Sequence, residues 1–110
     1  MRIAEVIGTV TLSRVHPALA SQRFVIGVPF SLLALQQGGK PDGEEVVILD
    51  RLQAGYGSRI GISEGVEAAM PFFPERTPVD AYCACILDQI TIHDRPVGGN
   101  HETSALIRER

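Results

Sequence analysis

The sequence predicts an all-β fold, a small five-stranded barrel with one short helix. Two observations support this prediction: short apolar segments rich in β-branched residues, and the glycine- and proline-containing connections between them. The chain has 110 residues, which is enough for one hydrophobic core. Trp is absent and aromatic residues make up 5%, so Val, Ile, Leu and Ala must fill that core. Such a core suits a thin barrel better than a broad sandwich.

The first predicted strand covers residues 2–13. Its side chains alternate, and one face carries the small or apolar residues Ala4, Val6, Gly8, Val10 and Leu12. A period of two with β-branched residues is typical of a strand. Gly8 lies in its middle, and a glycine there indicates the bend or bulge that a closing barrel needs.

Three shorter strands are predicted over residues 24–28, 45–50 and 59–62, with a turn over residues 37–43 and a glycine loop around residues 54–58. Ser63 is a suitable N-cap for a short helix over residues 64–70, which Pro71 ends. This order is that of an OB-like barrel in which the helix precedes the fifth strand rather than following the third.

The last predicted strand, residues 79–92, has two apolar faces. One carries Val79, Ala81, Cys83, Cys85 and Leu87, and the other carries Tyr82, Ala84, Ile86, Ile90 and Ile92. An antiparallel strand at a surface normally has one polar face, so the second apolar face needs a cover. We expect a neighbouring subunit to provide it. Asp80 and Asp88 interrupt that face and are expected to form turn or inter-subunit hydrogen bonds.

We divide the chain into a barrel domain, residues 1–93, and a polar tail, residues 94–110. The tail lacks apolar periodicity and is expected to form at most one or two helical turns, and otherwise to be mobile or to dock on a partner.

Charge and composition exclude several partners. The formal net charge is −3 and Lys40 is the one lysine, which argues against a nucleic-acid partner and against a basic membrane-binding patch. No apolar run approaches the ~20 residues of a membrane span, and charges near the N-terminus argue against a signal peptide. We therefore expect a reduced, cytoplasmic protein without a membrane partner.

We predict no catalytic residues, no metal site and no cofactor, and therefore no enzyme. The glycine loop lacks the lysine and spacing of a phosphate-binding motif, so a tight turn is favoured over a phosphate cradle. Cys83 and Cys85 with His93 or His101 have the wrong spacing for zinc and are favoured as small apolar residues. The serines lack a nucleophile setting.

Three segments resemble the EutN/CcmL family of bacterial microcompartment vertex proteins. They are residues 1–10 (MRIAEVIGTV), residues 50–57 (DRLQAGYG), and residues 78–81 with 86–90 (PVDA and ILDQI), in the family's order and spacing. The resemblance implies a homopentamer that caps the five-fold vertices of a shell in the cytoplasm, beside hexameric shell proteins. The expected interface residues are Asp80, Tyr82, Ala84, Ile86 and Asp88.

The resemblance also places the glycine loop near the five-fold axis. It carries over to Ala54, Gly55 and Gly57, and the candidate lining of an axial opening is Gln53, Ala54, Gly55, Tyr56, Gly57 and Ser58. Gln53 stands where the family has its first loop glycine, and Ser58 where an acidic residue is common. The alternative hypothesis is an OB-like binding module for an oligonucleotide or another small ligand.

Overall fold

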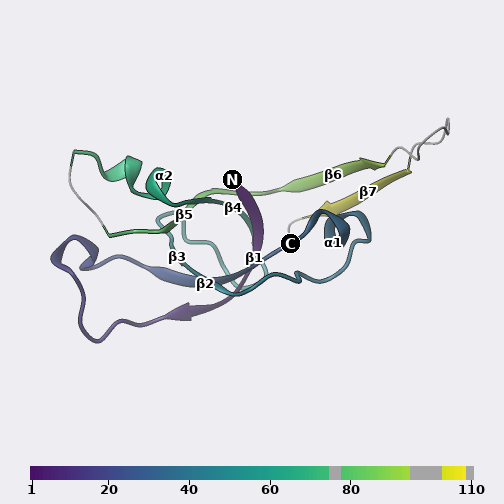
Figure 1. Cartoon of the computed structure of the whole chain (residues 1–110). Coiled ribbons are helices and arrows are strands. Elements are labelled where there is room, and N and C mark those ends of the chain that lie inside the picture. Colours follow the sequence, from purple (N-terminus) through teal and green to yellow (C-terminus); the bar gives the residue numbers. More distant parts are fainter. Residues whose placement is uncertain (75–77, 95–102, 109–110) are drawn as a thin grey trace.

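A closed barrel of five strands forms the body of the protein (Figure 1). The computed structural model describes residues 1–74, 78–94 and 103–108. The barrel strands are β1 (Arg2–Val10), β2 (Phe24–Pro29), β3 (Val46–Leu49), β4 (Arg59–Glu64) and β5 (Ala81–Ile86). They lie in the order β1-β2-β3-β5-β4, with β4 closing onto β1. The predicted five-stranded barrel is confirmed.

Strand β1 links the two halves of the barrel. It pairs antiparallel with β4 through Arg2–Glu5 and with β2 through Ala4–Val10. The register against β2 shifts between Val6 and Gly8, which confirms the irregularity expected at this glycine. The strand ends at Val10, three residues before the predicted end at Ser13.

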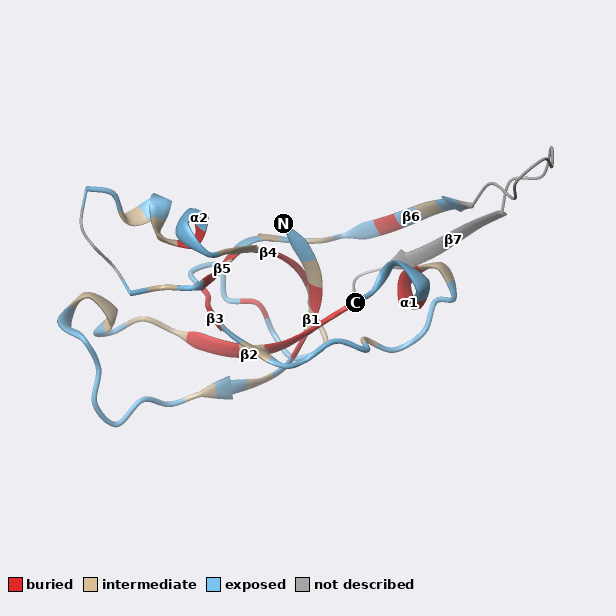
Figure 2. Cartoon of the chain, in the orientation of Figure 1, coloured by how far each residue is buried: buried red, intermediate tan, exposed pale blue. Residues whose placement is uncertain are grey.

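The barrel interior holds small and β-branched side chains, as the composition required. Buried residues recur along the barrel strands (Figure 2). Its fully buried members come from all five strands and the loop after β3: Ala4, Val6, Val25, Ile48, Ala54, Ile60, Ile62, Ala81 and Cys83. Of the two faces predicted to point inward, Ala4 and Val6 of β1 and Ala81 and Cys83 of β5 are confirmed in the core, whereas Leu12 is 39% exposed and Leu87 packs against another cluster. The seam between β3 and β5 is parallel and rests on a single residue pair, Leu49 with Tyr82.

A short helix lies between β4 and β5, as predicted, but it begins later. Helix α2 (Val66–Ala69) continues into the 3₁₀ turn η2 (Met70–Phe72). Ser63 is not its cap, because Ser63 and Glu64 still belong to β4 and pair with β5. Arg2 holds Glu64 in the strand through hydrogen bonds of 2.6 and 2.7 Å. Gly65, at φ 67°, then makes the turn into the helix.

The sequence did not predict helix α1 (Leu32–Gln36) or the 3₁₀ turn η1 (Pro17–Leu19). Ser31 caps α1 by accepting a 3.0 Å hydrogen bond from the Ala34 amide. The Asp42 carboxylate in turn accepts hydrogen bonds from the Ser31 amide and hydroxyl, which lowers the pKa of Asp42. A helix of five residues is too short for its period to show in the sequence.

The predicted single last strand is wrong, because the chain leaves the barrel at Leu87. The Leu87 amide donates to the Arg59 carbonyl at 2.8 Å, and β6 (Gln89–Asp94) then pairs with β7 (Thr103–Arg108) in a separate two-stranded sheet. This hairpin extends from the barrel on the side opposite α2 (Figure 1). The part of the tail in β7 is therefore a strand and not a helical turn. The division at residue 93 stays a prediction.

No helix in the described part of the chain is long and apolar enough to cross a membrane.

Candidate functional site

A buried carboxylate organises the first half of the glycine loop. Asp50 follows β3 and is 2% exposed. Its Oδ1 accepts a 2.9 Å hydrogen bond from the Leu52 amide, and its Oδ2 accepts one of 2.8 Å from the Ala54 amide. The Arg23 guanidinium donates to Oδ2 at 2.7 Å, and the backbone amide of Asp50 donates to the Arg23 carbonyl. The buried charge is thus paired and hydrogen-bonded, as a buried charge must be.

The second half of the loop is fixed to β1. Gly57 donates its amide to the Val6 carbonyl at 2.8 Å, and the Val6 amide donates to the Ser58 carbonyl at 2.9 Å. Gly57 has φ 84°, a conformation that favours glycine. Both halves of the loop are therefore held by specific contacts, and its outer residues occupy defined positions.

The candidate axial residues differ in exposure. Tyr56 is 85% exposed and stands out from the loop, while Gln53 and Gly55 are also exposed and Gly57 and Ser58 are half-buried. Ala54 is fully buried in the barrel core, so it anchors the loop. The structure thus brings the exposed candidates together on one projection, and their axial role stays a prediction.

Gln53 occupies the left-handed region, with φ 60°, which glycine adopts without strain. This conformation costs a residue with a side chain about 1 kcal/mol or more. We expect Gln53→Gly to stabilise the protein by roughly 0.5–1 kcal/mol, since relief of strain exceeds the extra freedom of glycine in the unfolded chain. Urea unfolding checks this, with the β-branched Gln53→Val as the matched variant of opposite effect. Equal midpoints for all three proteins would contradict it.

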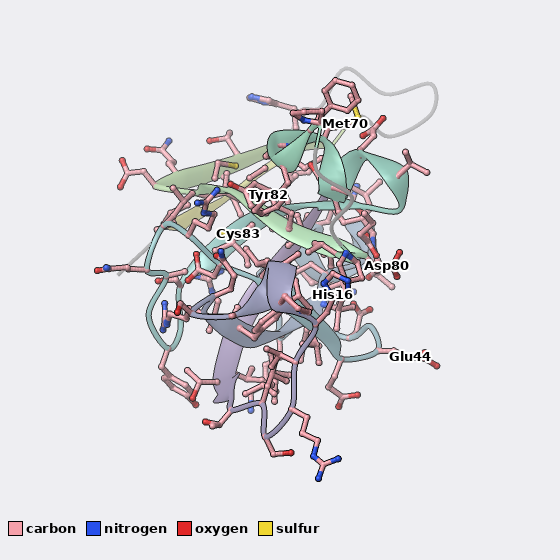
Figure 3. The ribbon with its side chains drawn as sticks, turned by 90° about the vertical axis from the view of Figure 1, so that its left-hand side faces the viewer. His16, Glu44, Met70, Asp80, Tyr82 and Cys83 are labelled. Carbon is pink, nitrogen blue, oxygen red and sulfur yellow. The ribbon has the colours of Figure 1, made fainter. Side chains whose placement is uncertain are left out.

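The outward face of β5 is covered at one end and open at the other. Tyr82 packs edge-on against Phe72 of η2, with ring centroids 5.7 Å apart, and lies beneath the segment that carries Met70 (Figure 3). Ala84 is exposed, and Ile86 is 40% exposed. Asp80 and Asp88 are exposed on either side of the strand.

The remaining residues of that predicted face have a cover within the chain. Ile90 is buried in a second cluster with Phe30, Ala34 and Leu35, and Ile92 packs against the same cluster. The face left for another molecule is therefore short and consists of Ala84 and Ile86, which we call the open β5 face.

The two cysteines are free thiols that serve the fold. Burial, and then the nearby Asp50 carboxylate, raise the pKa of Cys83 to about 12, so its thiol stays protonated at neutral pH. His93 lies on β6, outside the barrel, and His101 lies outside the described residues. Within the described ranges, no three His, Cys, Asp or Glu side chains gather as a metal site would require.

The sequence reasoning missed the contact between Asp50 and Arg23. One signal for it was present: an acidic residue directly after the apolar run of residues 46–49 and directly before the loop. Asp in such a position commonly accepts hydrogen bonds from backbone amides that follow it. Nothing in the sequence pointed to Arg23 as the second partner.

Comparisons with known proteins agree with this geometry. Residues 1–88 match the family model described as ethanolamine utilisation protein EutN/carboxysome. The chain is 33% identical over 98 residues to the carboxysome shell vertex protein CcmL of Gloeobacter violaceus, covering 88% of this chain and 92% of the relative. It is also 33% identical over 104 residues to CcmL of Synechococcus elongatus, covering 94% and 100%.

Solved structures show the same fold. The structure of Gloeobacter violaceus CcmL aligns with a TM-score of 0.74 at 27% identity, over 91% of this chain and 98% of that one. The GrpN pentameric microcompartment shell protein of Rhodospirillum rubrum aligns with a TM-score of 0.67 at 25% identity, over 80% and 94%. Matches of this extent, together with the barrel and its glycine loop, establish that the chain belongs to the EutN/CcmL family.

Proposed function

We propose that this chain is a structural shell protein, which forms a cyclic pentamer and caps the five-fold vertices of a bacterial microcompartment. The observation that carries the proposal is the match over nearly full length to carboxysome shell vertex proteins and to a pentameric shell protein. The proposed location is the microcompartment shell in the cytoplasm. The proposed role is architectural rather than catalytic, and association is its functional step.

Shell geometry explains why a pentamer is needed. A flat layer of hexagons cannot close on itself, and pentagonal units at the corners supply the curvature. Hexameric shell proteins are therefore the proposed neighbours of the pentamer.

The open β5 face supports the ring interface. In a cyclic pentamer each subunit meets its neighbour through two unlike patches, so one apolar patch per subunit is enough for every contact. Ala84 and Ile86 provide such a patch on the second half of barrel strand β5, and the exposed Asp80 and Asp88 lie before and after the strand. An apolar centre with a polar rim is the usual anatomy of a protein interface.

We also propose that the glycine loop lies near the five-fold axis. Five copies of Gln53, Gly55, Tyr56, Gly57 and Ser58 would then surround any axial opening, with Ala54 holding each loop to its barrel. Tyr56, which is 85% exposed, has the largest of these side chains and would narrow the opening most.

The alternative, an OB-like module that binds an oligonucleotide or another small ligand, has weaker support. The formal net charge is −3, whereas nucleic-acid binding needs clustered cations. Single-strand binding also relies on exposed stacking rings. The outward face of β5 carries one aromatic side chain, Tyr82, and Phe72 packs against it.

Native mass spectrometry of the purified protein, with light scattering in solution, tests the proposed function. We expect a dominant species of five subunits, because each open β5 face loses its exposure on ring closure. A titration with single-stranded DNA at low salt is the accompanying control and should leave the species unchanged. A stable monomer that binds the DNA in a salt-dependent manner would favour the binding module instead.

A further inference from the structure

A polar hollow lies beside the glycine loop, between the turn that precedes β2 and the segment that follows β3. It has a volume of about 340 Å³. Its lining residues all carry polar or charged side chains: Ser21, Gln22, Arg23, Asp50, Arg51 and Gln53. The volume is within the range of small-molecule sites, and the lining lacks the apolar centre of a protein interface.

The first of its two guanidinium groups is held in place by the buried carboxylate. Arg23 Nη1 donates to Asp50 Oδ2 at 2.7 Å, while the Arg23 side chain remains 38% exposed. A guanidinium carries five N–H donors, and this contact uses one of its nitrogens. The other oxygen of Asp50 is occupied by the Leu52 amide. Arg23 is thus fixed at one end and retains donors for a second acceptor.

The second guanidinium has no acidic partner in the described part of the chain. Arg51 lies over the Phe72 ring, with its Cζ 5.1 Å from the ring centroid, and the ion pairs there join Arg2, Arg23 and Arg59 to other carboxylates. Contact with an aromatic face steadies a guanidinium and leaves its N–H edge free. The lining of the hollow therefore carries two guanidinium groups and one carboxylate, which gives it a net positive charge.

Backbone strain is concentrated at the same place. Among the described residues, Ser21 at φ 65° and Gln53 at φ 60° are the non-glycine residues with positive φ, and both line the hollow. Such conformations are costly, and strained residues cluster at active sites and ligand-binding sites. Here they bring a serine hydroxyl and a glutamine amide to the rim of a cationic hollow.

We propose that this hollow binds the carboxylate or phosphoryl group of a small anion. Arg51 provides the principal, bidentate contact, because its guanidinium edge matches the spacing of two oxyanion oxygens. Arg23 provides the second charged donor, and Ser21, Gln22 and Gln53 provide neutral hydrogen bonds. The site is built from a single chain and does not depend on the proposed shell function.

Isothermal titration and amide NMR shifts with inorganic phosphate, and separately with succinate, test the site on the assembled protein. We expect saturable millimolar binding, with shifts at Ser21, Gln22 and Arg51. Arg51→Gln should weaken binding roughly tenfold, since one charge-assisted contact is lost. Arg14→Gln removes an exposed arginine that does not line the hollow and should leave binding unchanged. Comparison of the two probes shows whether the phosphoryl or the carboxylate group is preferred.

Two outcomes would overturn the proposal. One is that neither anion binds, or that binding is the same in wild type and Arg51→Gln. The other is binding by an Ile86→Glu monomer but not by the ring, because a neighbouring subunit would then fill the hollow in the shell. Arg51-dependent binding in both assembly states supports it, whatever the number of subunits proves to be.

Discussion

Ile86→Glu should convert the assembled protein into folded monomers. The Ile86 side chain is 40% exposed in the isolated chain and lies on the open β5 face, beyond the cover that Phe72 gives to Tyr82. In a ring, a glutamate at this position would be a buried charge without a partner. We expect a cost of about 3 kcal/mol per interface, or roughly a 100-fold loss of affinity at every contact of the ring.

Native mass spectrometry at micromolar concentration measures this effect, and circular dichroism checks that the barrel is intact. Ala84→Glu should act in the same way from the adjacent position of the face. Two matched controls separate the effect of the position from the effect of the charge. Ile86→Val changes the same position but keeps an apolar side chain. Leu33→Glu adds the same charge to the exposed surface of α1. A five-subunit species in both glutamate variants of β5 would show that the ring uses another surface.

Asp50→Ala should cause the largest loss of stability of any single carboxylate substitution in the barrel. It would remove the acceptor of the Leu52 and Ala54 amides and leave the Arg23 guanidinium without its partner. Breaking a buried, hydrogen-bonded ion pair in this way costs about 3–5 kcal/mol. Asp50→Asn keeps an oxygen acceptor but not the charge, so an intermediate loss is expected.

Urea unfolding in the Ile86→Glu background measures the effect without a contribution from subunit association. Glu44→Ala, at an exposed carboxylate, is the control and should change stability by less than about 0.5 kcal/mol. Faster hydrogen exchange at the Leu52 and Ala54 amides would locate the damage in the glycine loop. A loss below about 1 kcal/mol for Asp50→Ala would mean that the loop does not depend on this carboxylate.

Periodicity predicted the barrel because its strands are regular. The alternation around Ala4 and Val6 and the inward pair Ala81 and Cys83 follow from a period of two, and β3 follows from a continuous apolar run. Where the structure differs from the prediction, contacts between residues distant in the sequence determine the course of the chain. Glu64 stays in β4 because Arg2, distant in sequence, holds it, and residues 89–94 leave the barrel to pair with residues 103–108. No local pattern contains either partner.

The candidate site was predictable in part for the same reason. The glycine loop and the apolar outward face of β5 are visible in the sequence, whereas the cover of that face is not. Phe72 and the α1 cluster shield Tyr82 and Ile90, and they leave Ala84 and Ile86 open. Likewise, the position of Asp50 was visible, but its pairing with Arg23 across 27 residues depends on the fold.

The place of β5 in the chain sets the order of events during synthesis. It is the last of the barrel strands to leave the ribosome, and it lies between β3 and β4, which were made before it. The earlier strands cannot close around their core until β5 arrives, because both of its neighbours would otherwise present unpaired edges. The surface that carries Ile86 therefore comes into existence in the same step that completes the barrel. A nascent chain therefore cannot associate through this surface before its own barrel is complete.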